Sequence, residues 1–220
     1  MSKTKVEIRE MFNVCLNCGE YRVDKAVESK GEKTFASCPA CNHAHEFLQL
    51  PLFIVTGASG TGKSTVAFEL SSLTKDFVVM ETDILWDHRY HTPETNYREY
   101  RELWLRMAKN ISQSGKPVVL CGTAMPDQLE PCMERRYFSE LIYIALVCDN
   151  DQLKQRLQNR PSWRNSYPDE FINGMMSYNT WLKENSNKNK PVINLIDTTN
   201  ASPNDTAQQI KTMIHGKYKL

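Results

Sequence analysis

Hydrophobic residues recur in short consecutive runs along most of the chain, separated by longer amphipathic or polar segments. Runs that are apolar at every position are typical of strands buried on both faces of a parallel sheet. Alternation of such strands with helices indicates a three-layer α/β fold. We therefore predict a five-stranded parallel sheet, with strands at residues 51–56, 77–80, 118–122, 141–148 and 192–196.

Helices are predicted between and after these strands. Residues 97–114 place apolar side chains at helical spacing, and Gly115-Lys116-Pro117 ends that pattern. The last helix has a start signal, because Ser202 can cap it, Pro203 suits its first turn and Asp205 suits its positive end.

The first fifty residues lack this alternation and carry two cysteine pairs instead. Cys15-x-x-Cys18 is followed, after nineteen residues, by Cys38-x-x-Cys41. Two such pairs at this separation are typical of four thiolates around one tetrahedral zinc ion. Between them we predict a hairpin, with strands at 21–27 and 34–37 and a turn at 29–33, so the segment resembles a zinc ribbon.

A segment of about fifty residues buries too little surface to fold securely alone, and a closed metal site would supply stability. We predict a structural Zn²⁺ in a domain at residues 1–50, followed by a second domain at residues 51–220. A redox dithiol or an iron–sulfur cluster is the alternative. His43 or His45 could replace a thiolate, although four sulfurs already complete the shell. The predicted ligands are Cys15, Cys18, Cys38 and Cys41.

A complete phosphate-binding loop follows the first predicted strand. Residues 57–64 read G-x-x-x-x-G-K-[ST], with a strand before them and helical spacing after them. In that context backbone N–H groups and the helix N-terminus surround phosphate oxygens. Lys63 is expected to reach the β- and γ-phosphates of ATP, and the Ser64 hydroxyl to hold Mg²⁺. The predicted nucleotide-binding residues are Gly57, Ala58, Ser59, Gly60, Thr61, Gly62, Lys63, Ser64 and Thr65.

Further polar residues follow the other predicted strands. Asp83 comes after the second strand, and Asp197-Thr198-Thr199-Asn200 comes after the fifth. After the fourth strand, Arg156 and Arg160 are four residues apart, so they would project from one face of a helix. Ligands of open α/β sheets bind beyond the carboxyl ends of the strands, where all of these residues are expected.

This combination resembles the P-loop small-molecule and nucleotide kinases, from Leu52 to about His215. The resemblance implies a P-loop NTPase fold in which Asp83 orients or deprotonates the acceptor hydroxyl. It also implies that Arg156 and Arg160 are lid arginines and that residues 197–200 pass the adenine ring. Phosphoryl transfer itself needs positioning and positive charge more than covalent help from the protein.

Other roles stay open for these charged residues. Asp83 could be a water-mediated magnesium ligand or could cap the following segment. Arg156 and Arg160 could form a solvated helix face paired with Asp149 and Asp151, and such surface pairs contribute little to stability.

Two further groups of residues lie outside these motifs. Aromatic residues after the second strand could line an acceptor pocket or belong to the core; they are Trp86, His88 and His91. The cysteines outside the two pairs are expected to be small buried apolar groups; they are Cys121, Cys132 and Cys148.

The chain departs from other P-loop classes at the third strand. Residues 118–123 contain no Walker-B aspartate, which argues against a motor-type ATPase. The sequence therefore does not identify the magnesium ligands other than Ser64. The sequence also lacks the N-K-x-D motif with which G proteins recognise the nucleotide base, so a GTPase is disfavoured.

Composition adds little to these motifs. The formal net charge is +1, so there is no global electrostatic argument for nucleic acid or an acidic membrane. Lys25, Lys30 and Lys33 near the ribbon turn are offset by Glu28 and Glu32, so nucleic acid is a weakly supported partner. The chain lacks an apolar segment of about twenty residues and a secretory signal, so we expect a cytoplasmic protein.

The sequence thus predicts an ATP-dependent phosphotransferase whose acceptor is a nucleoside, a nucleotide or a similar metabolite, with Mg²⁺ and Zn²⁺ as metals. The alternative is an ATP-binding or ATPase module whose zinc ribbon contacts nucleic acid or a protein partner. A third interpretation makes the ribbon a dimer contact or a wall of the acceptor pocket.

Overall fold

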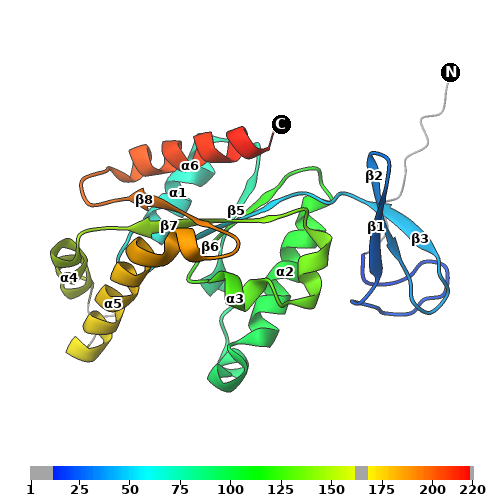
Figure 1. Ribbon diagram of the computed structural model, residues 1–220, viewed down its shortest axis with the longest axis horizontal. Helices are drawn as coiled ribbons and strands as arrows, with labels where there is room; N and C mark the ends of the chain where they lie inside the picture. Colours follow the sequence, from blue (N-terminus) through cyan, green and yellow to red (C-terminus); the bar gives the residue numbers. More distant parts are fainter. Residues whose placement is uncertain (1–11, 162–167, 219–220) are drawn as a thin grey trace.

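The computed structural model describes residues 12–161 and 168–218 and contains two sheets of unequal size (Figure 1). The larger sheet has five parallel strands in the order β5-β6-β4-β7-β8. The sheet predicted from the apolar runs is confirmed, and each strand end lies within one residue of its predicted place. The strands are β4 (Leu52–Gly57), β5 (Val78–Glu81), β6 (Val118–Cys121), β7 (Leu141–Val147) and β8 (Ile193–Asp197).

Helices cover both faces of this sheet, which confirms the three-layer fold (Figure 1). One face carries α1 (Lys63–Leu73) and α6 (Pro203–Lys217), and the other carries α2 (Arg98–Ser112), α3 (Pro126–Leu129) and α5 (Asp169–Asn185). A shorter helix, α4 (Asn150–Gln158), follows β7. Short 3-10 helices are η1 (Thr82–Leu85), η2 (His88–Tyr90), η3 (Pro93–Thr95), η4 (Met133–Tyr137) and η6 (Ser186–Lys188).

The core consists of two layers that meet at the central strands. Along β4, Phe53 and Val55 face α1 and α6, whereas Leu52 and Ile54 face α2 and α5, as the two-residue period of a strand requires. The central strands β4, β6 and β7 are buried throughout, but the edge strands β5 and β8 are partly exposed. Of the helices in the described ranges, none combines the length and apolar character needed to cross a membrane.

The smaller sheet is antiparallel and has three strands, β1 (Ala26–Lys30), β2 (Lys33–Ser37) and β3 (Ala44–Phe47). The predicted hairpin exists, but its limits were wrong, because the turn is only Gly31 and Glu32, and β3 was not predicted. The flanking lysines looked like loop residues in the sequence. In the sheet they form exposed ion pairs instead, Lys30 with Glu28 and Lys33 with Glu46.

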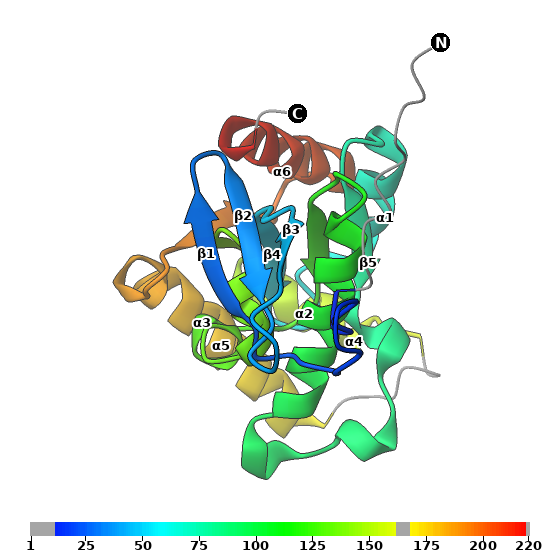
Figure 2. The same ribbon diagram turned by 90° about the vertical axis from the view of Figure 1, so that its right-hand side faces the viewer.

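The small sheet lies at one end of the larger part of the chain, at the right of Figure 1 and facing the viewer in Figure 2. Phe12 and Phe47 meet Tyr137 of η4 in a buried aromatic cluster, with the Phe12 and Tyr137 ring centroids 4.7 Å apart. Lys25, which the sequence placed near a basic turn, is fully buried here. Its Nζ donates to the Phe12 carbonyl oxygen at 2.7 Å and lies 3.2 Å from His45 Nε2, so this lysine adds nothing to a surface patch.

A buried ion pair lies beside this aromatic cluster. The Nζ of Lys109, on α2, is 2.6 Å from Glu134 Oε2 and donates to Asn13 Oδ1 at 2.5 Å. The same ammonium lies 4.4 Å from the ring centroids of Phe12 and Tyr137. Burial lowers the pKa of Lys109 to about 8, against the opposing effect of Glu134. The ion pair therefore joins α2 to η4, and the hydrogen bond to Asn13 connects Lys109 to the segment that precedes the small sheet.

We expect Glu134→Gln to destabilise the protein by about 3–5 kcal/mol, because it leaves the Lys109 ammonium buried without a carboxylate. Urea unfolding measures the change. The matched control is Glu46→Gln, which breaks an exposed pair and is expected to cost less than about 1 kcal/mol. Equal effects of the two substitutions would show that the buried pair between α2 and η4 contributes no more to stability than an exposed pair does.

Candidate active site

The phosphate-binding loop joins β4 to α1 in the predicted context. Its glycines have positive φ angles, 138° at Gly57, 94° at Gly60 and 99° at Gly62, which other residues rarely adopt. A Cβ at Gly57 would also lie 2.4 Å from the Leu146 carbonyl oxygen on β7. α1 then begins at Lys63 with no acidic residue in its first turn, so its free N–H groups favour an anion.

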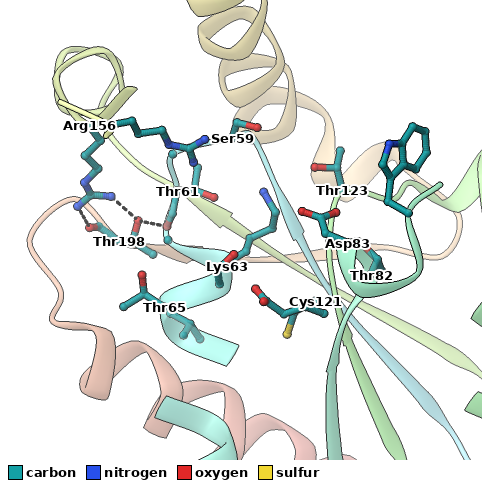
Figure 3. Close-up of a pocket in the computed structure, with 18 of the residues that line it drawn as sticks. Ser59, Thr61, Lys63, Thr65, Thr82, Asp83, Cys121, Thr123, Arg156 and Thr198 are labelled. Atoms are coloured by element: carbon teal, nitrogen blue, oxygen red, sulfur yellow. Dashed lines mark hydrogen bonds between the residues drawn. The ribbon is translucent and has the colours of Figure 1, made fainter. Parts of the chain in front are cut away.

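Lys63 is folded back over the loop. Its Nζ donates to the carbonyl oxygens of Gly57, at 2.8 Å, and Ala58, at 3.0 Å. Burial, with Arg160 as the second cause, lowers the pKa of Lys63 to about 8, although Asp83 acts in the opposite direction. Figure 3 shows Asp83 facing Lys63 across the cavity. A bound phosphate would draw this ammonium away from the two carbonyl groups.

We expect nucleotide binding to take up protons near pH 8. With a pKa of about 8, about half of the Lys63 side chains are neutral at that pH in the free protein. Phosphate oxygens stabilise the ammonium form and raise this pKa, so about half a proton per chain should enter on binding. Calorimetry in two buffers of different ionisation enthalpy measures the uptake. It should fall to about a tenth of a proton at pH 7, and the same uptake in Lys63→Met would contradict the assignment.

Asp83 lies at the carboxyl end of the sheet, in η1, and lines the same cavity as the phosphate-binding loop. Gly122, after the neighbouring strand β6, makes room for this segment, because a Cβ there would lie 1.9 Å from Thr82 Oγ1. The hydroxyl of Tyr100, on α2, donates to the Thr82 carbonyl oxygen. Asp83 is therefore positioned by contacts from two neighbouring elements.

The acids nearest the loop come from β5 and η1. β6 pairs directly with β4 and ends at Cys121, which is buried and offers no carboxylate. Glu81, the last residue of β5, also lines the cavity; it was not among the predicted site residues, although it stands two residues before Asp83. Hydroxyl and carboxylate oxygens are the donors that Mg²⁺ prefers, so Ser64, Glu81 and Asp83 fit this ion.

The two candidate lid arginines both line the cavity, but they do not share a helix face. α4 ends at Gln158, so Arg160 lies beyond the helix and that part of the prediction was wrong. The cause is Pro161, which disfavours helical geometry at the residue before it. The suggested pairing with acids is also not seen at Asp149, which caps α4 instead by accepting from backbone N–H groups. Residues 162–167, which continue the predicted lid, lie outside the described residues.

Arg156 is tied to the loop after β8. Its Nη1 donates to Thr198 Oγ1 at 3.2 Å and its Nη2 to the Thr198 carbonyl oxygen at 2.7 Å. The Thr198 hydroxyl in turn donates to the carbonyl oxygens of Thr61 and Val147, both at 3.1 Å. Figure 3 shows this connection between Arg156, Thr198 and the phosphate-binding loop. Of residues 197–200, which were expected near the adenine ring, Thr198 therefore contacts the loop directly.

The cavity continues past Asp83 to an aromatic wall. Its volume of about 990 Å³ is at the upper end for small-molecule sites and leaves space beside a nucleotide. Trp86 and His91 line this wall, in agreement with the interpretation that placed them in an acceptor pocket rather than in the core. His88 does not line the cavity. Residues from α2 and its N-terminus complete the wall and were not among the predicted site residues; they are Tyr97, Tyr100 and Arg101.

The four cysteines of the two pairs form a second candidate site, in the segments before β1 and between β2 and β3. Their Sγ atoms all lie within 4.8 Å of one another, with Cys15 and Cys41 3.6 Å apart and Cys18 and Cys38 3.8 Å apart. Four sulfurs about 2.3 Å from one tetrahedral ion are about 3.8 Å from each other, so the geometry fits a single Zn²⁺ better than a cluster of several irons. His45 is buried, contacts Lys25 and is not part of the group of four possible metal ligands. The other cysteines are buried, as predicted; they are Cys121, Cys132 and Cys148.

Comparisons with known proteins agree with this fold. A family model described as an AAA domain matches residues 54–171. Among solved structures, a tunicamycin resistance protein from Deinococcus radiodurans has a TM-score of 0.54 at 17% identity, covering 75% of this chain and 95% of its own. A shikimate kinase from Acinetobacter baumannii has a TM-score of 0.50 at 21% identity, covering 78% and 96%. A gluconokinase from Sinorhizobium meliloti has a TM-score of 0.50 at 14% identity, covering 77% and 98%. The comparison with curated proteins found no match.

Proposed function

The chain belongs to the AAA domain family, and from that premise we propose that it is an ATP-dependent kinase of a small-molecule acceptor. One observation carries the proposal. Lys63 and Asp83 line a single cavity, which extends past both of them to an aromatic wall. An enzyme that only hydrolyses ATP needs no such second compartment. Two of the solved structures with this fold are named as a shikimate kinase and a gluconokinase, which supports the same class of reaction.

The proposed reaction is a direct transfer of the terminal phosphoryl group. An acceptor hydroxyl oxygen bonds to the γ-phosphorus, the bond from that phosphorus to the β,γ-bridging oxygen breaks, and the electrons leave with ADP. Asp83 receives the hydroxyl proton or orients the hydroxyl. Lys63, Arg156 and Arg160 supply positive charge around the transferring group. Mg²⁺ bound by Ser64 with Glu81 or Asp83 would neutralise phosphate charge.

A coupled assay for ADP tests this proposal. ATP is offered with nucleosides, nucleotides, sugars, sugar acids and aminoglycosides, and phosphorylated product is identified by mass spectrometry. We expect at least one acceptor to raise ADP formation well above the rate without acceptor. Hydrolysis that no acceptor accelerates would favour the ATPase alternative.

We further propose a metal-binding module at residues 1–50 and a kinase module at residues 51–220, with a structural Zn²⁺ in the first. The four-thiolate set leaves no open position for a substrate, which supports a structural ion. Seven free cysteines suit a reducing compartment, and the cytoplasm stays our expectation.

The alternative role of the ribbon, contact with nucleic acid, has little support. Of the three lysines first considered for it, Lys25 is buried, Lys30 pairs with Glu28 and Lys33 pairs with Glu46. A nucleic-acid surface needs basic side chains that are free to meet phosphates.

A further inference from the structure

Arg101 is a buried cation at the acceptor end of the cavity. It follows Tyr100 on α2, lines the cavity and is 8% exposed. Its Nη2 donates to Gln128 Oε1 at 3.2 Å, whereas its Nε is buried and has no hydrogen-bond partner. No carboxylate in residues 12–161 or 168–218 forms an ion pair with it. The guanidinium thus lacks both a counter-charge and part of its hydrogen bonding.

This arrangement differs from that of the other buried cation on the same helix. Lys109 has a carboxylate at 2.6 Å, while the groups that act most on Arg101 are tyrosines and a thiol. Burial lowers the pKa of Arg101, but a guanidinium stays charged at physiological pH. A buried charge without a partner is costly, and proteins keep such groups chiefly where a ligand completes them.

The phosphates of the nucleotide already have cations of their own. Lys63 begins α1 directly after the loop, and Arg160 acts on it electrostatically. Arg156 is tied to the loop through Thr198. Arg101 instead stands beside Tyr100, whose hydroxyl holds the Thr82 carbonyl next to Asp83. The unpaired guanidinium therefore belongs to the acceptor compartment.

We propose, on the basis of the kinase function above, that Arg101 binds an anionic group of the acceptor. The acceptor then carries two features, a hydroxyl that meets Asp83 and a carboxylate or phosphate ester that meets Arg101. The planar guanidinium fork pairs with either anion through two parallel hydrogen bonds. Sugar acids, hydroxy acids and nucleoside monophosphates fit this description, whereas neutral sugars and nucleosides do not.

The first experiment observes Arg101 directly and needs no knowledge of the acceptor. The Nε–H resonance of Arg101, assigned with Arg101→Lys, is followed by ¹⁵N NMR in protein saturated with MgADP. Inorganic phosphate and sodium acetate are titrated in, with sodium chloride at equal ionic strength as the control. We expect one anion to shift the resonance saturably at millimolar concentration. Phosphate alone would indicate a phosphate ester, acetate alone would indicate a carboxylate, and no response to either would overturn the proposal.

The second experiment compares acceptors that differ only in charge, gluconate against glucitol and uridine monophosphate against uridine. We expect the anionic member of a pair to be preferred, and Arg101→Met to lower its kcat/KM by about 100-fold, with partial recovery in Arg101→Lys. Arg98→Met, on the same helix but outside the cavity, is the matched control. Equal losses for charged and neutral acceptors would show a structural role and overturn the proposal.

The two proposals can fail separately. Anion binding at Arg101 without phosphorylation of any acceptor would leave the anion site standing and remove the kinase. Phosphorylation of neutral acceptors, without any response of the Arg101 resonance to anions, would leave the kinase standing and remove the anion site.

Discussion

Replacing Lys63 by methionine is expected to lower kcat/KM for ATP by about 10³-fold or more, equivalent to about 4 kcal/mol of lost transition-state stabilisation. Lys63 is the one lysine that lines the cavity, among the residues that the structure describes, and methionine keeps its length while removing its charge. The loss arises because charge develops on the phosphoryl oxygens during transfer, and a fixed ammonium offsets it without reorganisation. Steady-state kinetics with the acceptor found by the assay above measures the effect.

The control for this prediction is Lys75→Met, an exposed lysine just past α1. We expect its kinetics to match those of the original protein. Since Lys63 also donates to two loop carbonyl groups, circular dichroism and thermal unfolding of Lys63→Met should be compared with those of the control. A variant that folds normally and keeps more than about a tenth of the activity would remove Lys63 from the proposed mechanism.

The second large effect concerns the metal. We expect one zinc ion per chain by elemental analysis, and Cys38→Ser to abolish stoichiometric binding, because the closed site then lacks one thiolate. Structural zinc contributes on the order of 10–16 kcal/mol in zinc-finger peptides, far more than a three-stranded sheet of this size can supply by burial. Hydrogen exchange in β1, β2 and β3 should therefore rise sharply in the variant.

Cys132→Ser is the matched control, because Cys132 is buried in the larger core and lies outside the metal cluster. It should retain a full complement of zinc even if it lowers overall stability. Iron in place of zinc, or protection of β1–β3 that survives complete metal removal, would be inconsistent with a structural zinc ion.

Local motifs were the features that the sequence predicted well. The loop at residues 57–64 and the two cysteine pairs each place their chemistry within a few neighbouring positions, so spacing alone locates them. The strands of the large sheet were also predicted, since burial on both faces leaves an uninterrupted apolar run. The roles of the individual site residues stay predictions.

Features that depend on contacts between distant segments were not predicted well. Lys25 and Arg101 look like surface residues in the sequence, and their burial depends on Phe12 in one case and on the packing of α2 against η1 in the other. Arg160 was placed on a helix because the four-residue spacing was given more weight than Pro161. Glu81 was passed over because an acid at the end of a strand looks like the start of a loop.

Helix α2 has two roles. Tyr100 and Arg101 line the acceptor compartment, while Lys109 contacts Phe12 and Asn13 of the front module. Trimming the chain to begin at Pro51 would therefore do more than delete an accessory. It would leave Lys109 of α2 and Glu134 and Tyr137 of η4 facing water, and α2 must also hold the substrate wall in place. Anyone seeking a minimal catalytic fragment should expect poor solubility and a loosened acceptor pocket, and should keep the front module attached.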